Sequence, residues 1–287
     1  MKLSVVIPTY ERPNEILRLT SGLLDQTLSL KIIIVDTSKS INEILSKAKN
    51  PNFKYIYLPD NLWISYSRNL WLNEVDDDFV LFMDDDFVLN YKSRLTEFKN
   101  ELQELDCHIL WWEVNNINAE NYDFYWKYII QNNILYHYIW LNNDSWFYDV
   151  IFNYFIAKTQ KIIDIGWWDD NLKFAREHDD FFINWKQKWL KVWYNKNFWI
   201  DHIHNWIKHY EQHEVNNKWS SMKYFCQKWW ISSKVEIRLI GTWKNKYLSI
   251  YRFMWEKYID ITEQELKEIF QEYELEYWSI PFIYKHL

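Results

Sequence analysis

Glycine is nearly absent from this chain, which has 3 glycines but 20 tryptophans among its 287 residues. Glycine normally supplies about 7% of the residues of a protein, and tryptophan is one of the rarer amino acids. With so few glycines, the sequence has no glycine-rich loop of the kind that cradles phosphates, and Pro8-Thr-Tyr-Glu-Arg12 follows the first apolar run instead. This absence argues against proteins that bind nucleotides through such a loop.

Other absences narrow the class of protein further. The two cysteines, Cys107 and Cys226, form no metal-binding motif and suit a reducing compartment. No stretch reaches the roughly 20 apolar residues of a transmembrane helix, and Pro8 breaks the first apolar run, which therefore does not resemble a signal peptide. The net charge of -7 argues against nucleic acid as a partner, because phosphate binding needs a basic surface. We expect a cytoplasmic protein, and a peripheral contact with the inner face of the membrane stays open.

Apolar runs alternate with helical patterns in the first part of the chain. Four runs have the length of β-strands: residues 3–10, 30–35, 53–58 and 78–83. Helical patterns follow the first three of these runs, at residues 13–23, 41–49 and 64–75. This alternation predicts an α/β fold with a mostly parallel sheet covered by helices.

The end of the chain has a different pattern, which becomes helical after about residue 205. Thr262-Glu-Gln-Glu265 is a capping box that predicts the start of an amphipathic helix. We therefore expect one α/β domain over residues 1–230 and a helical C-terminal extension over residues 231–287.

Polar side chains stand where three of the predicted strands end. Asp84-Asp-Asp86 follows the fourth strand directly, Asp36 ends the second, and Thr9 with Glu11 follows the first. Ligands bind at the carboxyl ends of the strands in open α/β sheets, and three adjacent carboxylates need a cation to neutralise them. A solvated acidic turn would explain the aspartates alone, but not their convergence with the other strand ends.

A second acidic cluster, Glu177-His-Asp-Asp180, lies at the start of a predicted helix. The helix dipole favours ionised carboxylates there, which suits a general base. Spacing does not decide which carboxylate is the base: Asp179 is the first choice, Glu177 the second and Asp180 the third. A capped acidic first turn with no chemical role is the structural alternative.

Several segments, in this order, resemble the nucleotide-binding half of family 2 glycosyltransferases: Val5-Val-Ile-Pro-Thr-Tyr-Glu-Arg12, Ile33-Ile-Val-Asp36, residues 61–72 and Phe82-Met-Asp-Asp-Asp86. Later segments are similar to ganglioside-type β1,4-N-acetylgalactosaminyltransferases: residues 155–158, 165–173, 177–182, 190–192 and 201–202. The resemblance covers residues 1–230 and implies a GT-A fold. It also implies an inverting, metal-dependent transfer of a sugar from a nucleotide sugar, with UDP as the first choice, to a glycan or lipid-linked acceptor in cell-surface polysaccharide synthesis.

The resemblance implies roles for single residues. The nucleotide sugar would contact Pro8, Thr9, Glu11, Asp36, Arg68, Asp84 and Asp85. Mn²⁺ or Mg²⁺, acting as a Lewis acid on the diphosphate leaving group, would be held by Asp84, Asp86 and His202, with His204 as the substitute for the histidine. Arg68 has an equal reading as a surface cation, and a lone histidine is more often structural than a ligand.

Two other classes share parts of the pattern. A sugar nucleotidyltransferase would have the same kind of sheet and metal carboxylates, but it would need a basic, glycine-rich phosphate loop. A non-catalytic carbohydrate-binding protein would use exposed aromatic residues, but it would have no use for both acidic clusters. The pattern therefore favours the glycosyltransferase.

The tryptophans depart from the family pattern, because many of them stand where that pattern has glycine. Lysine far outnumbers arginine, and asparagine, isoleucine and tyrosine abound, which is typical of an AT-rich gene. We hypothesise that the gene uses UGA as a glycine codon and that the sequence has been translated with UGA read as tryptophan. The affected positions would include Trp63, Trp71, Trp112, Trp167, Trp189, Trp193 and Trp230, whereas Trp168 and Trp229 would be genuine. A truly tryptophan-rich protein is the alternative.

Overall fold

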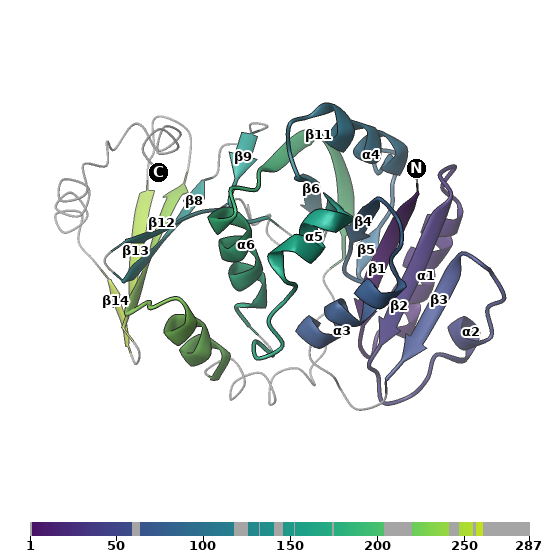
Figure 1. Ribbon diagram of the computed structural model, residues 1–287, viewed down its shortest axis with the longest axis horizontal. Helices are drawn as coiled ribbons and strands as arrows, with labels where there is room; N and C mark the ends of the chain where they lie inside the picture. Colours follow the sequence, from purple (N-terminus) through teal and green to yellow (C-terminus); the bar gives the residue numbers. More distant parts are fainter. Residues whose placement is uncertain are drawn as a thin grey trace. The chain divides into compact units, whose positions relative to one another are not determined.

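The computed structural model describes residues 2–58, 64–117, 126–131, 133–140, 146–151, 153–173, 175–203, 220–240, 247–254 and 257–260. The chain divides into two compact units, which are Met1–Trp126 with Asn142–Trp229, and Lys127–Leu141 with Trp230–Leu287 (Figure 1). The second unit is thus assembled from two separate stretches of the chain, whereas the sequence predicts a single break after residue 230.

A nine-stranded sheet forms the centre of the first unit. Four parallel strands in the order β3-β2-β1-β4 make up one half: β1 (Leu3–Thr9), β2 (Leu30–Asp36), β3 (Phe53–Tyr57) and β4 (Phe79–Phe82). The sheet continues as β10-β6-β11-β5, and β9 pairs with β11. These strands are β5 (Phe87–Val88), β6 (Ile109–Asn116), β9 (Trp146–Tyr148), β10 (Phe155–Lys158) and β11 (Val192–His202). The predicted α/β fold is confirmed.

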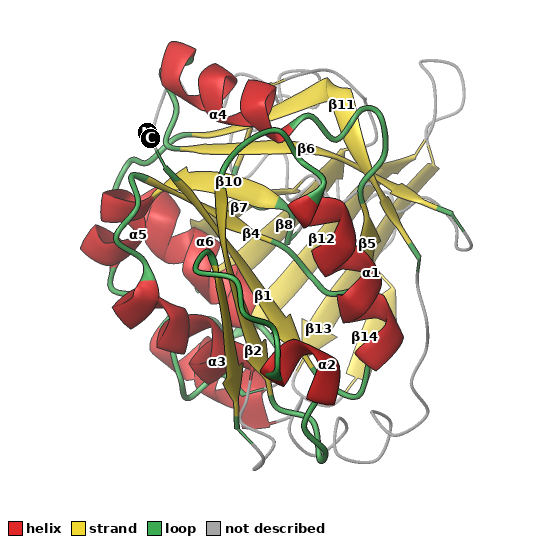
Figure 2. Ribbon diagram, turned by 90° about the vertical axis from the view of Figure 1, so that its right-hand side faces the viewer, coloured by secondary structure: helices red, strands yellow, loops and turns green. Residues whose placement is uncertain are grey.

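Helices cover both faces of this sheet, so β1 and β2 are buried along almost their whole length. They are α1 (Pro13–Leu24), α2 (Glu43–Ser46), α3 (Ile64–Leu70) with the 3₁₀ turn η1 (Trp71–Glu74), α4 (Leu95–Glu104), α5 (Thr159–Ile165) and α6 (Glu177–Gln187). Residues 220–228 form a further helix. Figure 2 shows α3, α5 and α6 on the face opposite α1. Among the described residues, no helix combines the length and apolar character needed to cross a membrane.

The helix predicted for residues 41–49 is shorter than expected. The side chain of Asn42 accepts hydrogen bonds from the backbone N–H groups of Ile44 and Leu45, which caps the helix and makes it begin at Glu43. The other predicted elements of the first 83 residues agree with the structure to within a few residues at their ends.

An aromatic cluster packs around Phe82, the last residue of β4. Its ring centroid lies 4.8 Å from that of Trp71, 5.0 Å from that of Phe155 and 4.9 Å from that of Trp168. Trp168 in turn stacks on Phe181 of α6, with centroids 4.1 Å apart and the rings only 7° from parallel. Aromatic pairs of this kind contribute about 0.5–1.5 kcal/mol each to stability beyond the burial of their area. The end of β4 is therefore held by well-packed aromatic side chains.

The sheet of the second unit has the strand order β14-β13-β12-β8-β7. Its strands are β7 (Trp126–Gln131), β8 (Ile134–Trp140), β12 (Ser233–Ile240), β13 (Tyr247–Met254) and β14 (Lys257–Asp260). Residues 233–240, 247–254 and 257–260 are therefore strands, where the sequence predicts a helical extension over residues 231–287. In the sequence of β12, Val235, Ile237 and Leu239 alternate with charged residues, and this period of two is that of a strand. The capping box at residues 262–265 lies outside the described residues.

Candidate active site

The strand-end residues singled out in the sequence meet at one edge of the first sheet. Because β1, β2 and β4 are parallel, Thr9, Asp36 and the triplet Asp84–Asp86 all lie at their carboxyl ends. β10 runs antiparallel to β4, so Asn153, which precedes it, reaches the same edge. β6 runs antiparallel to β10, so it ends at this edge. β11 runs parallel to β6 and also ends there, in His202.

Arg12 forms ion pairs with two of the three aspartates. Its Nη1 donates to Oδ1 of Asp85 at 2.8 Å and to Oδ2 of Asp86 at 2.6 Å. Thr9 donates from Oγ1 to the other oxygen of Asp85 at 2.6 Å. Burial, opposed in part by the charge of Arg12, raises the pKa of Asp85 to about 7. Sequence reasoning gave Arg12 no role, although it sits directly before Pro13, where α1 begins.

His202 lies against Asp86. Its Nε2 is 3.3 Å from Oδ2 of Asp86, and its Nδ1 is 2.6 Å from Oδ1 of Asn116. The pairing of Phe87 with His202 and a hydrogen bond from the N–H of Ile203 to the carbonyl of Asp86 fix this approach. If Nδ1 donates to Asn116, the lone pair of Nε2 faces the carboxylate of Asp86, and a cation between the two would be bound by both.

Asp86 has a carboxylate oxygen suited to a metal ion. Oδ1 is buried and makes no hydrogen bond within the described residues. Burial opposes ionisation, but the hydrogen bond with His202 and the charge of Arg12 outweigh it and lower the pKa of Asp86. Adjacent ligands of an octahedral ion bound at about 2.1 Å lie about 3 Å apart, and Nε2 of His202 lies 3.3 Å from Oδ2 of Asp86, the oxygen that also accepts from Arg12. Oδ1 would therefore be the oxygen of Asp86 that takes a divalent cation.

Asp84, the third predicted metal ligand, is held separately. Asn153 donates from Nδ2 to Oδ1 of Asp84, and Nη2 of Arg68 lies 4.0 Å from the same oxygen. Over the part of the chain that the structure describes, no three His, Cys, Asp or Glu side chains converge as one metal-binding group. A metal on Asp86 and His202 would thus need further ligands from water or substrate, as is usual for Mg²⁺. Burial raises the pKa of Asp84 to about 6, although 32% of its side chain stays exposed.

Arg68 joins the two acidic clusters. The side chain is only 3% exposed, and its Nη1 donates to Oε1 of Glu177 at 3.3 Å. The guanidinium also lies over the ring of Trp168, 5.6 Å from its centroid. Because Arg68 also approaches Asp84, it lies inside the site and is not the surface cation of the alternative reading.

The three candidate bases in the first turn of α6 have different surroundings. Glu177 faces Arg68, whereas Asp179 accepts a hydrogen bond from Nη1 of Arg176 at 2.6 Å. Asp180 is fully buried and accepts hydrogen bonds from Lys228 and Trp229. Glu177 is connected through Arg68 to Asp84 of the strand-end cluster.

The residues at the end of β1 and β2 shape a loop. Asp36 accepts from the N–H of Ser38 at 2.9 Å and from the hydroxyl of Tyr55 at 2.5 Å. Glu11, with a positive φ of 53°, accepts from the N–H of Lys39 at 2.7 Å, and its own N–H donates to Ser38 Oγ at 2.7 Å. Both carboxylates are thus used in positioning residues 37–39. Pro8 lies within β1, and the predicted substitute ligand His204 lies outside the described residues.

The raised pKa of Asp84 predicts a gain in stability when its charge is removed. The pKa rises from 3.8 to about 6 on folding, so ionising Asp84 lowers the free energy of unfolding progressively from about pH 4 to pH 6, and the loss is complete above that range. Asp84→Asn should therefore raise the melting temperature of the metal-free protein at pH 8 and have a smaller effect at pH 5, measured by thermal denaturation in EDTA. In the exposed control Asp76→Asn, where Lys31 lowers the pKa of the carboxyl, no gain is expected at pH 8. An equal loss of stability at both pH values in Asp84→Asn would contradict the burial argument.

Comparison with known proteins places the fold. The model of the family described as glycosyl transferase family 2 matches residues 4–165, more than half of the chain. A crystal structure of S. aureus TarS 1-349 in complex with UDP-GlcNAc has a TM-score of 0.58 and 18% sequence identity, over 78% of this chain and 65% of TarS. A crystal structure of GalNAc-T7 with UDP, GalNAc and Mn²⁺ has a TM-score of 0.55 and 12% identity, over 71% of this chain and 44% of the other.

These solved structures share the fold of this chain. Because the sequence identities are only 18% and 12%, the similarity shows the fold alone. The chain spans less than two thirds of the TarS and GalNAc-T7 chains that it matches. A search of curated proteins gives no significant match. The family match over residues 4–165 and the mostly parallel sheet, with its strand-end carboxylates, agree with each other. The chain belongs to glycosyl transferase family 2 and has a GT-A fold.

Proposed function

We propose that the protein is an inverting, metal-dependent glycosyltransferase. Its donor would be a nucleotide sugar, with UDP as the first choice, and its acceptor a hydroxyl of a glycan or lipid-linked sugar in cell-surface polysaccharide synthesis. The observation that carries the proposal is the ionised Asp86, which has an unbonded buried oxygen beside His202 at the ligand-binding edge of a family 2 sheet. The titles of the TarS and GalNAc-T7 structures, which name UDP-GlcNAc, UDP and Mn²⁺, support the choice of donor and ion.

The residues at this edge have separable roles in the proposal. Asp86 and His202 would hold Mn²⁺ or Mg²⁺, which as a Lewis acid would stabilise the charge of the leaving diphosphate. Arg12 keeps Asp86 ionised and oriented. Asp84, whose side chain is 32% exposed, would contact the ribose or the water shell of the metal.

Glu177 has the geometry that best suits a general base. Its side chain is 13% exposed, compared with 7% for Asp179 and none for Asp180. Nη1 of Arg68 lies 3.3 Å from Oε1 of Glu177 and holds this side chain near the strand-end aspartates. We therefore place Glu177 ahead of Asp179, which was the first choice from the sequence, and Asp180 last, because Asp180 is already bound to Lys228 and Trp229.

Donor turnover tests this proposal. The protein should release UDP slowly from a UDP-sugar in the presence of Mn²⁺, and Asp86→Ala should abolish this release. Removing a residue that only supports a metal ligand costs about 10–100-fold in affinity or activity, so loss of the ligand itself should cost more. Asp76→Ala is the matched control, since this side chain is 77% exposed, and it should keep full activity. Normal turnover by Asp86→Ala would refute the metal assignment.

The two alternative classes give different results with suitable substrates. Release of pyrophosphate from UTP and a sugar 1-phosphate, without release of UDP from the nucleotide sugar, would indicate a sugar nucleotidyltransferase. Saccharide binding without any turnover would indicate a carbohydrate-binding protein.

We further propose that many of the tryptophans are glycines in the native protein. Three of the six non-glycine residues with positive φ in the described chain are tryptophans: Trp167 at 78°, Trp189 at 58° and Trp230 at 56°. All three were assigned as glycine from the sequence. Trp189 and Trp230 are also 75% and 81% exposed, so packing does not explain an indole there. The left-handed region costs an L-residue about 1–2 kcal/mol and costs glycine nothing comparable.

The two tryptophans assigned as genuine have different surroundings. Trp168 is buried and stacks on Phe181, and the indole N–H of Trp229 donates to Oδ1 of Asp180 at 2.8 Å. Neither has a positive φ. For Trp71, Trp112 and Trp193 the backbone gives no support for glycine, and the assignment rests on the sequence pattern alone. Trp63 lies outside the described residues.

The codons of the gene test this assignment directly. We expect UGA at Trp167, Trp189 and Trp230, and UGG at Trp168 and Trp229. In urea denaturation, glycine at each of the three positive-φ positions should raise the free energy of unfolding by about 1 kcal/mol. The control Trp168→Gly should lower it by about 3–5 kcal/mol, because it removes a buried aromatic side chain. UGG at all of these positions would end the recoding hypothesis.

A further inference from the structure

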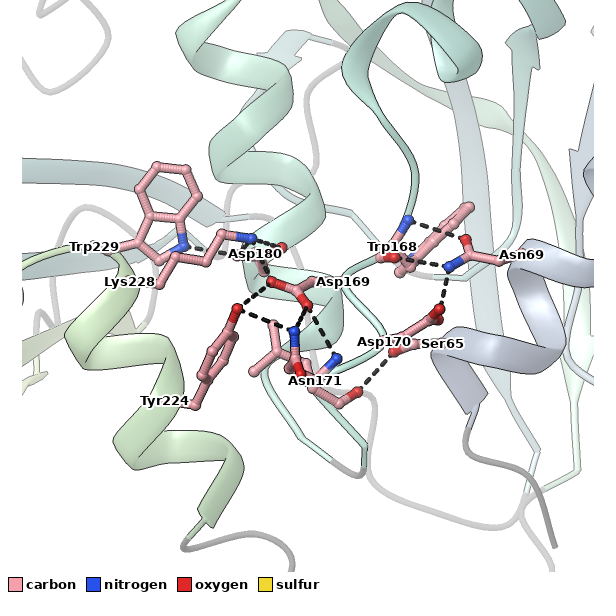
Figure 3. A network of polar contacts seen from close by, with 11 residues as sticks. Ser65, Asn69, Trp168, Asp169, Asp170, Asn171, Asp180, Tyr224, Lys228 and Trp229 are labelled. Carbon is pink, nitrogen blue, oxygen red and sulfur yellow. Dashed lines mark hydrogen bonds and ion pairs between the residues drawn. The ribbon is translucent and has the colours of Figure 1, made fainter.

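Lys228 lies between two carboxylates that come from different segments of the chain (Figure 3). Its Nζ is 2.8 Å from Oδ2 of Asp169 and 2.8 Å from Oδ1 of Asp180. The indole N–H of Trp229 donates to Asp180 at 2.8 Å, and the hydroxyl of Tyr224 donates to Asp169 at 2.9 Å. Each carboxylate therefore receives two donors from residues 224–229.

These contacts hold residues 220–229 against the start of α6. Asp180 belongs to the first turn of α6 and is fully buried, and Asp169 belongs to the loop between α5 and α6. A buried carboxylate that loses its cation is strongly destabilising, because its charge is left uncompensated. Although burial raises the pKa of Asp180, the ammonium group of Lys228 opposes that shift. The first turn of α6 thus depends on Lys228 for charge compensation.

The loop that carries Asp169 is also bound to α3. Nδ2 of Asn69 donates to the carbonyl of Trp168 at 2.7 Å and to Oδ1 of Asp170 at 2.8 Å, and the N–H of Trp168 donates back to Asn69 at 3.1 Å. Ser65 donates to the carbonyl of Leu172 at 2.7 Å. Figure 3 shows these bonds and those of Lys228 on the same loop.

α3 and α6 carry the two partners of the ion pair at the site. Arg68 lies one residue before Asn69, and Glu177 lies one turn before Asp180 on the same helix. The contacts of Asn69 and Lys228 thus fix the backbones of α3 and α6. These two helices carry Arg68 and Glu177, whose side chains lie 3.3 Å apart.

We propose that Lys228 is a positioning residue, which bridges Asp169 and Asp180 and thereby fixes the first turn of α6 and its candidate bases with respect to Asp84–Asp86. This inference rests on the proposed function, because only transfer needs that geometry. Lys228 lies outside residues 4–165, which the family model matches, so this support for the site comes from a part of the chain beyond that match.

Steady-state kinetics of Lys228→Met test the proposal. The kcat for sugar transfer or donor hydrolysis should fall about 10–100-fold, as expected for a misplaced reacting group, while the KM for the nucleotide sugar should stay within about twofold. Glu177→Gln should give the same split. Lys228→Arg should recover much of the loss, since a guanidinium can bridge two carboxylates. Lys223→Met, at an exposed position of the same helix, should match the unaltered protein.

Hydrogen exchange separates this inference from the proposed function. In Lys228→Met, the amides of the first turn of α6 should exchange faster, while those of β1 and β2 stay protected, whether or not a donor has been found. Unchanged exchange at α6, unchanged kcat, or a parallel loss of kcat and donor binding would each overturn the positioning role. If the unaltered protein turns over no nucleotide sugar but exchange at α6 responds as expected, the proposed function fails and the bridge of Lys228 stands.

Discussion

Repulsion among the three carboxylates at the end of β4 is the constraint on which the site depends. Asp85 and Asp86 are buried, and Asp84 is buried in part, so their charges are poorly solvated and must be compensated by the protein. The compensating charges come from distant parts of the sequence, namely Arg12 before α1 and Arg68 on α3, and His202 at the end of β11 lies against Asp86. Neutralising the triplet therefore joins both halves of the sheet at one edge.

The charge balance at this edge favours a divalent cation. Asp84, Asp85, Asp86 and Glu177 carry four negative charges when ionised, and Arg12 and Arg68 supply two positive ones. The difference of two is what one Mn²⁺ or Mg²⁺ ion would supply. Without a cation, protons take its place, which agrees with pKa values raised to about 6 and about 7 for Asp84 and Asp85. In the proposed function, the same residues that limit stability in the free protein would bind the metal and the diphosphate.

The sequence predicted the parallel strands and their polar ends, because aliphatic runs and strand-end carboxylates are local features. It did not predict Arg12 or Lys228, whose roles depend on partners more than 70 and 45 residues away in the chain. Among the carboxylates of α6, only tertiary contacts distinguish Glu177 from Asp180. The strand β12 could have been predicted from its alternation of apolar and charged residues. The left-handed backbone at Trp189 could be suspected from the scarcity of glycine and from the family pattern, which has glycine there.

Calorimetric titration with UDP tests the central claim most directly, namely that the edge around Asp86 binds a metal and a nucleoside diphosphate together. The account predicts one UDP site per chain, with binding in the presence of Mn²⁺ at least about tenfold tighter than in EDTA, and no such difference in Asp86→Ala. Absence of UDP binding, or equal affinity with and without Mn²⁺, would contradict it.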